Sequence, residues 1–134
     1  MDNCIFCKII KGEIPSYKIY EDEHVYAFLD ISKDVYGHTL VIPKKHCKNI
    51  LDIDNSELNY VMNAVKLISN YYVEKLGFDG INTFNNNEES ASQSVMHLHF
   101  HIIPRKNNDG VKIFTEGNKQ DFDLEKAYNE LKIN

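Results

Sequence analysis

Apolar residues recur at helical spacing in two parts of the chain. A short helix is predicted over residues 5–10, where isoleucine and phenylalanine repeat with the helical period, and Gly12 closes it. A much longer helix is predicted from Asp54 to Leu76, because Asp54 and Glu57 form a capping-box pattern before an apolar stripe and Gly77 ends the last turn. One long helix and a short N-terminal helix are therefore expected.

Short extended segments bounded by turn residues account for most of the remaining pattern. The segment 85–92 is too polar for anything but a loop, and the tail is predicted to hold a strand over 111–114 and a helix over 121–131. Short strands around one long helix predict an α+β domain with a largely antiparallel sheet of about five strands. These strands are predicted over residues 18–21, 24–29, 39–42, 81–84 and 95–103, and Pro104 is expected to end the last of them.

Length, charge and hydropathy exclude several classes of protein. The 134 residues suit a single domain over 1–134, and no targeting segment or membrane-spanning run is visible, so a soluble cytoplasmic protein without a membrane partner is expected. The 15 basic and 20 acidic side chains give a formal charge of −5. This charge argues against a nucleic-acid partner, because such binding requires clustered lysine and arginine to neutralise phosphates.

The last predicted strand contains three histidines in a stretch of five residues. His97, His99 and His101 alternate with bulky apolar residues, so all three are expected to project from one face of the strand. They could chelate a catalytic metal, although residues 102–106 offer no carboxylate as a further ligand. Alternatively, His99 is a nucleophile that attacks phosphorus. In that case the preceding loop supplies polar donors for a phosphate, namely Asn86, Ser92, Gln93 and Ser94.

The three cysteines are too few, and odd in number, for a secreted disulfide framework. Cys4 and Cys7 are one helical turn apart, so both thiols can face one point, as in half of a zinc site or in a redox pair. A redox pair would be expected after a strand, and this pair lies at the start of the chain. Cys47 is interpreted as an ordinary thiol.

The histidine segment His-Leu-His-Phe-His-Ile-Ile at 97–103 resembles the signature of the histidine triad (HIT) family. Gln93-Ser94-Val95 and the segments 4–15, 27–31 and 37–46 are also similar to family segments, in family order. The resemblance covers about residues 4–106 and leaves the tail 107–134 uninformative. It implies a HIT-like fold and a nucleotide hydrolase or transferase that acts at the α-phosphate of nucleoside monophosphate conjugates.

The resemblance also implies a role for each matching residue. His99 would be the nucleophile that forms a nucleotidyl-histidine, with its other ring nitrogen held as a donor to a backbone carbonyl, while His101 and Ser94 assist the phosphate and the leaving group. His38 would lie on the side of the triad away from the nucleotide and support the triad there. The nucleotide would contact Phe6, Phe28 and Ile31 at the base, Asp30 at the ribose, and Asn86, Ser92, Gln93 and Ser94 near the phosphate.

Several of these residues also have an ordinary structural interpretation. Phe6 and Phe28 could be core residues, Asp30 could cap a turn before Ser32, and His24 is interpreted as solvated surface. Ser90-Ala91-Ser92 replaces the glycines that family members usually carry before Gln93, and Ser92 is expected still to offer its N–H to a phosphate.

Zinc-containing members of the family resemble this chain at four positions, which implies one structural zinc held by Cys4, Cys7, His46 and His97. Within the family, the chain most resembles the Hint-like branch and its bacterial zinc-containing members. Proteins of this branch mostly act on nucleoside phosphoramidates and acyl-adenylates. A purine nucleotide of the AMP or GMP type is therefore the expected ligand. A dinucleoside polyphosphate hydrolase and a nucleotide-binding regulatory protein with incidental hydrolysis remain alternatives. Such proteins are commonly homodimers, and Tyr71 and Tyr72 are expected to form an exposed aromatic pair at the interface.

Overall fold

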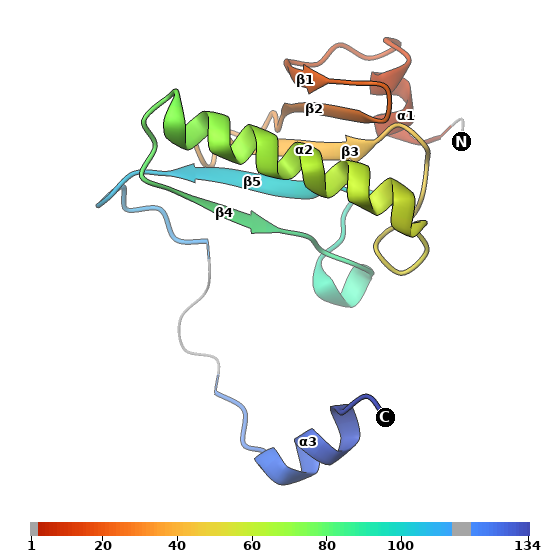
Figure 1. Cartoon of the computed structure of the whole chain (residues 1–134), viewed down its shortest axis with the longest axis vertical. Coiled ribbons are helices and arrows are strands. Elements are labelled where there is room, and N and C mark those ends of the chain that lie inside the picture. The colour runs from red at the N-terminus through yellow and green to blue at the C-terminus, as the bar shows by residue number, and fades with distance from the viewer. Residues whose placement is uncertain (1–2, 114–118) are drawn as a thin grey trace.

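A five-stranded antiparallel sheet forms the centre of the computed structural model, which describes residues 3–113 and 119–134 (Figure 1). The strand order is β1-β2-β3-β5-β4. The strands are β1 (Lys18–Glu21), β2 (Val25–Leu29), β3 (Thr39–Pro43), β4 (Gly80–Phe84) and β5 (Phe100–Arg105). The helices are α1 (Ile5–Ile10), α2 (Asn55–Glu74), the 3₁₀ turn η1 (Glu89–Ala91) and α3 (Leu124–Leu131). The predicted α+β class, the short N-terminal helix and the long helix are confirmed.

The two faces of the sheet are covered differently. The long helix α2 lies across one face, and Figure 1 shows it running over the central strands. Alternate residues of β2, β3 and β5 pack against it in the larger core, among them Ala27, Val41 and Ile102. The intervening residues, such as Phe28 and Leu40, form a smaller core with α1 on the opposite face. The side chains of His97, His99 and His101 therefore lie on the α1 face, away from α2.

The helix α2 follows its predicted stripe with two differences. Asp54 is the N-cap, but its carboxylate makes no cap hydrogen bond and instead accepts one from Lys45 Nζ. The expectation of an exposed Tyr71–Tyr72 pair is wrong for Tyr72, which is 6% exposed and hydrogen-bonded to Thr39 Oγ1, whereas Tyr71 is 52% exposed. The helical period turns Tyr72 to the core, since it lies four residues after Ile68 on the buried face.

The predicted strand over 95–103 is shifted in the structure. Pairing begins at Phe100, opposite Val41 of β3, and with β4 at His101, whereas Leu98 N–H donates to the carbonyl of Cys47 in the loop after β3. Pro104 does not end the strand. It pairs only with Ile81 of β4, beyond the last residue paired to β3, where a missing N–H costs no ladder bond.

The turn before β3 depends on Gly37. Its φ is +78°, and an added Cβ would lie 2.6 Å from Pro104 Cγ, so a side chain would be both strained and crowded. This close approach fixes the start of β3 against β5 and sets the position of the next residue, His38.

The tail beyond β5 packs little against the sheet. Residues 111–113 form no strand, and the rest of the predicted strand over 111–114 lies outside the described residues. The predicted C-terminal helix is confirmed as α3, which is capped by the Asp123 side chain and has no buried residue. Figure 1 shows α3 apart from the sheet. Within the described parts of the chain, no helix combines the length and the apolar character needed to cross a membrane.

Candidate active site

His99 lies just before β5, in a buried position with a defined ring orientation. Its Nδ1 is 2.9 Å from the carbonyl oxygen of His97. A carbonyl oxygen only accepts hydrogen bonds, so Nδ1 carries the proton and Nε2 retains its lone pair. Burial lowers the pKa of His99, which keeps the ring neutral. The ring therefore has the tautomer and the charge that a nucleophile requires.

A pocket of about 240 Å³ opens next to this ring. Phe6 packs edge-on against both Phe28 and His99, at centroid distances of 5.4 and 5.2 Å. The structure brings seven of the predicted site residues together in its lining: Phe6, Phe28, Asp30, Ile31, Ser94, His99 and His101. The apolar residues line one part of the pocket, and the hydroxyl, carboxylate and imidazoles supply its polar groups.

His101, which lines the pocket, forms a hydrogen-bonded pair with His38. His101 Nδ1 is 2.8 Å from His38 Nε2, and His38 Nδ1 is 3.9 Å from a carboxylate oxygen of Asp30. The ring of His101 stacks on Phe84, and its Nε2 has no hydrogen-bond partner among the described residues. Burial, together with the neighbouring imidazoles, lowers the pKa of His101 to about 3. A neutral ring whose Nε2 is buried and unpartnered among the described residues thus lies beside His99 in the pocket lining.

The loop before the histidine segment is held by buried polar contacts. The Gln93 side chain donates to the carbonyls of Lys48 and Val95 and accepts from Asn49 Nδ2 and Glu88 N–H. All four bonds of this amide are therefore made within the protein, and its predicted contact with a nucleotide stays a prediction.

Ser92 and Asn86 lie outside the pocket lining in this structure. Ser92 has a left-handed backbone, with φ of +69°, and its N–H donates to the carbonyl of Glu89. The expectation that this N–H is available for a phosphate therefore does not hold here, because the turn of η1 uses it. The predicted nucleotide contacts of Ser92 and Asn86 remain predictions.

Asn85 contacts the backbone of His99, and the sequence did not single it out. Its Nδ2 donates to the carbonyl of His99 at 2.9 Å, and its Oδ1 accepts from Asn87. Asn85 lies in a run of asparagines that predicts only a polar loop. The spatial contact with His99 distinguishes it from its neighbours.

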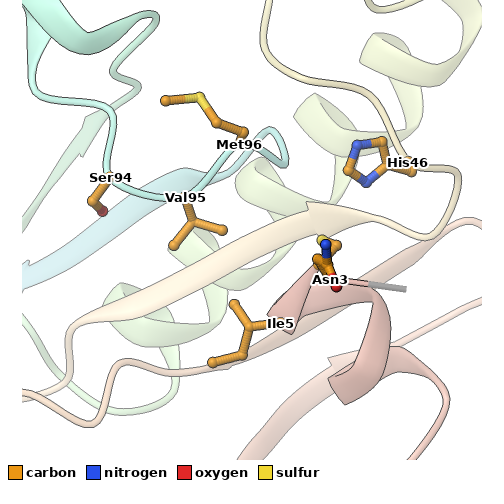
Figure 2. Close-up of a pocket in the computed structure, with 7 residues that line it drawn as sticks. Asn3, Ile5, His46, Ser94, Val95 and Met96 are labelled. Atoms are coloured by element: carbon orange, nitrogen blue, oxygen red, sulfur yellow. The ribbon is translucent and has the colours of Figure 1, made fainter. Parts of the chain in front are cut away.

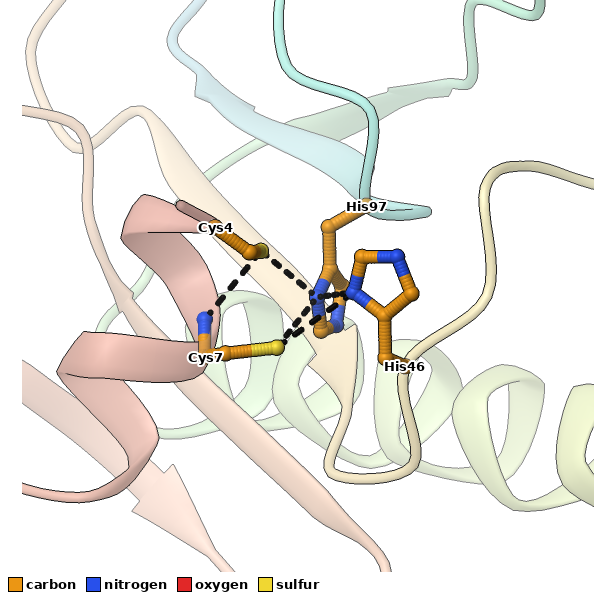
Figure 3. Close-up of side chains that lie close together, drawn as sticks. All are labelled: Cys4, Cys7, His46 and His97. Atoms are coloured by element: carbon orange, nitrogen blue, oxygen red, sulfur yellow. Dashed lines mark hydrogen bonds between the residues drawn. The ribbon is translucent and has the colours of Figure 1, made fainter. Parts of the chain in front are cut away.

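Four metal-ligand side chains converge at the N-terminal end of this region. Sγ of Cys4 lies 3.3 Å from Nδ1 of His97, Sγ of Cys7 lies 3.3 Å from Nδ1 of His46, and the two Nδ1 atoms are 3.2 Å apart. Figure 3 shows both thiols at the start of α1, Cys7 within the helix and Cys4 at its N-cap, with one histidine on the loop after β3 and the other before β5. The structure thus unites Cys4, Cys7, His46 and His97 in one cluster, within 4.8 Å of one another.

The geometry and chemistry of this cluster suit zinc. Tetrahedral zinc with two sulfur and two nitrogen ligands separates neighbouring ligand atoms by about 3.3–3.8 Å, close to the distances between these atoms. His97 Nε2 donates to the carbonyl of Pro43 at 2.8 Å, which leaves Nδ1 unprotonated and directed at the sulfurs. Burial raises the pKa of the Cys7 thiol to about 11 in the protein alone, and a bound cation would stabilise the thiolate.

Comparison with known proteins identifies the family. The HIT domain family matches residues 11–108, which include the three histidines. The chain belongs to the HIT family. This HIT protein is 48% identical over 130 residues to an uncharacterized HIT-like protein of Methanocaldococcus jannaschii, covering 96% of this chain and 98% of that one. It is 41% identical over 130 residues to the adenosine 5'-monophosphoramidase HNT1 of Saccharomyces cerevisiae, covering 96% and 80% of the two chains.

Solved structures of HIT proteins share the fold. A HIT family protein of Bacillus subtilis is 47% identical, with a TM-score of 0.82 over 96% of this chain and 92% of that one. A zinc-bound histidine triad protein of Mycobacterium smegmatis is 34% identical, with a TM-score of 0.79 over 96% and 89% of the two chains. The family, the fold and the suitability of the cluster for zinc therefore agree.

Proposed function

We propose that this HIT protein is a nucleotide hydrolase that cleaves phosphoramidates or acyl-adenylates at the α-phosphate and releases a purine nucleoside monophosphate. The observation that carries the proposal is the His99 ring, whose Nδ1–H is bound by a backbone carbonyl beside an apolar pocket. The yeast relative named an adenosine 5'-monophosphoramidase and an Arabidopsis relative named an adenylylsulfatase, 42% identical over 108 residues, support the same class of reaction.

The proposed reaction has two displacements at phosphorus. The lone pair on His99 Nε2 forms a P–N bond, and the bond from phosphorus to the leaving nitrogen or oxygen breaks with its electron pair, which takes up a proton. Water then attacks phosphorus, loses a proton, and displaces His99 Nε2. The balance is one conjugate and one water converted to a nucleoside monophosphate and the free amine or acid.

His101 and Ser94 are proposed to assist these steps. Both line the pocket with His99, and the unpartnered Nε2 of His101 can bind a phosphate oxygen or a proton in transit. His38 holds the other nitrogen of His101, so it positions that ring without contacting the nucleotide.

The remaining contacts follow from the lining of the pocket. Phe6, Phe28 and Ile31 would bind the base by shape, and Asp30 would accept ribose hydroxyls. Asp30 also caps a turn, since one of its oxygens accepts the Ser32 N–H at 2.7 Å, so its two interpretations are compatible. An apolar slot discriminates between bases by their size more than by the hydrogen-bonding groups on their edges. It therefore favours a purine over a pyrimidine.

One zinc per chain is proposed for Cys4, Cys7, His46 and His97. When bound, zinc with four protein ligands offers no open position, so it supplies structural cross-linking. The four ligands come from α1 and its N-cap, the loop after β3 and the segment before β5, so they join three parts of the chain around His99.

A homodimer is also proposed. The outer side of α2 carries a stripe of exposed apolar residues, Tyr60, Leu67 and Tyr71, at helical spacing. A stripe of this kind favours burial against a second copy over exposure to water.

Replacement of His99 tests the proposed function. His99→Ala is expected to reduce kcat/KM for adenosine 5'-phosphoramidate by at least about a thousandfold, because the nucleophile is lost. His24→Ala is the matched control, since His24 stacks on Tyr60 and is not part of the pocket lining, and it should retain turnover. Circular dichroism and zinc content should be unchanged in both variants. Near-normal turnover by the folded His99→Ala protein would refute the proposal.

A further inference from the structure

Asn85 lies directly after β4 and contacts the backbone of the proposed nucleophile. Its Nδ2 donates to the carbonyl oxygen of His99 at 2.9 Å, just before the paired part of β5. We propose that Asn85 is a positioning residue for the attack on phosphorus, acting through the backbone of His99 and not through contact with the nucleotide. This inference rests on the proposed function and adds a residue on which the rate of that reaction depends.

Two side-chain amides, here called the amide relay, join His99 to the loop after β3. Asn87 Nδ2 donates to Oδ1 of Asn85 at 2.6 Å, and Asn87 Oδ1 accepts the backbone N–H of Ile50 at 2.8 Å. A backbone N–H only donates and a carbonyl oxygen only accepts, so the two ends of the relay fix the orientation of both amides. The amide nitrogen of Asn85 must therefore face His99, and an acceptor in its place would be repelled.

The end of the relay distant from His99 is firmly held. Glu88 follows the relay and has φ of +77° and ψ of 161°, a conformation that a residue with a Cβ keeps only where its surroundings enforce it. Its carboxylate accepts from Asn49 Nδ2 and, at 3.0 Å, from Lys48 Nζ. Both partners lie on the loop after β3, so the relay is anchored to this loop by ionic and polar contacts as well as by its own bond.

The segment that carries His99 is only partly held by packing. Residues 94–96 border a pocket of about 560 Å³ together with His46, so one side of this segment faces open space (Figure 2). Further along, Leu98 N–H donates to the loop after β3, and the relay holds the His99 carbonyl from the end of β4. The ring of His99 is tied to the carbonyl of His97, so a shift of this backbone moves Nε2 relative to phosphorus. A displacement of about 1 Å can cost on the order of a hundredfold in rate.

The test compares the rate of the first displacement with the affinity for the product. Asn85→Asp keeps the size of the side chain but sets a carboxylate oxygen against the His99 carbonyl. It is expected to slow the consumption of adenosine 5'-phosphoramidate, in a single turnover with enzyme in excess, by roughly tenfold to a hundredfold. The dissociation constant for AMP, measured by calorimetry, should stay within about twofold of the parent value, since Asn85 does not line the nucleotide pocket. General loosening of the site would weaken AMP binding as well.

Two further variants make the test specific to the relay. Asn82→Asp, the same change on β4, is the matched control and should keep the parent rate, because Asn82 Oδ1 accepts from Arg105 Nη1 at 2.8 Å and a carboxylate retains this contact. Asn87→Ala removes the donor to Asn85 and should slow the single turnover by about threefold to tenfold. Added to Asn85→Asp, it should cause little further loss, because residues of one hydrogen-bonded network are not additive.

The outcomes separate the inference from the proposed function. If the parent consumes the substrate but Asn85→Asp matches Asn82→Asp, or if AMP affinity falls in proportion to the rate, the positioning role is refuted and the hydrolase stands. If circular dichroism shows that Asn85→Asp does not fold, Asn87→Ala decides, and a parent-like rate in that variant refutes the role. If the parent does not consume the substrate, the proposed function fails and the positioning role fails with it.

Discussion

The triad histidines differ in the partner of their second ring nitrogen. His97 donates from Nε2 to Pro43 and directs Nδ1 to the thiols, whereas His99 donates from Nδ1 to the carbonyl of His97 and leaves Nε2 free. His101 shares a hydrogen bond with His38. Three identical side chains on one face therefore acquire three different environments, because backbone carbonyls fix the tautomers of the first two.

Backbone strain at Ser92 yields a stability prediction. Its φ of +69° places a residue with a Cβ in the left-handed region, which glycine adopts without cost. Ser92→Gly is expected to raise the free energy of unfolding by about 0.5–1 kcal/mol, measured by urea denaturation. Ser90→Gly, inside the 3₁₀ turn η1, is the matched control and should lower stability, since it only adds freedom to the unfolded chain. Equal effects of the two variants would contradict strain at Ser92.

At the scale of the elements, the alternation of apolar and polar residues predicted the direction of the side chains but not the strand boundaries. The pattern from His97 to Ile102 correctly placed the apolar residues on the face opposite the histidines, where Leu98, Phe100 and Ile102 are buried in the core with α2. It could not show where pairing begins, because that depends on which distant backbone groups lie beside the segment, such as the Cys47 carbonyl that accepts from Leu98 N–H. A local pattern carries side-chain direction, whereas strand limits depend on distant partners.

Contacts between residues distant in the sequence were likewise not predicted from local patterns. The spacing of Cys4 and Cys7 left half of a zinc site and a redox pair open, and the resemblance added His46 and His97, which the structure brings to them. The roles of Asn49 and Asn85 were not predictable, since each acts through a hydrogen bond to a residue far along the chain. Polar residues in loops acquire such roles only when the fold is known.

Removal of zinc tests the role of the cluster that joins α1, the loop after β3 and the segment before β5. Chelation is expected to lower the free energy of unfolding, by on the order of 3 kcal/mol, because a cross-link is lost. Activity should then decline with the same time course as the change in circular dichroism. A catalytic metal predicts the opposite, namely immediate loss of activity in a protein that is still folded.

For the whole molecule, net charge is a poor guide to the ligand. The chain carries a formal charge of −5, yet the pocket next to His99 is lined mainly by neutral groups, and burial lowers the pKa of both His99 and His101. An anionic phosphate can be bound by local dipoles and hydrogen-bond donors without an overall positive field. The predicted division into a core over 4–106 and a tail over 107–134, and the predicted cytoplasmic location, remain predictions.

The proposed dimer is tested at Tyr71 on α2. Tyr71→Asp places a charge in the exposed apolar stripe and should raise the dimer dissociation constant by at least about tenfold, measured by light scattering over a dilution series. Tyr17→Asp, at a more exposed tyrosine outside this stripe, should leave the dissociation constant unchanged. A parent protein that is monomeric at micromolar concentration would exclude the dimer.

The central claim is that the reaction passes through a covalent bond to His99. The stereochemical course at phosphorus tests this claim most directly, with an adenosine 5'-phosphorothioamidate of defined configuration hydrolysed in water enriched in heavy oxygen. Two in-line displacements each invert phosphorus, so the product nucleoside phosphorothioate should show net retention of configuration by phosphorus NMR. Net inversion would show that water attacks the substrate directly and would contradict the nucleotidyl-histidine.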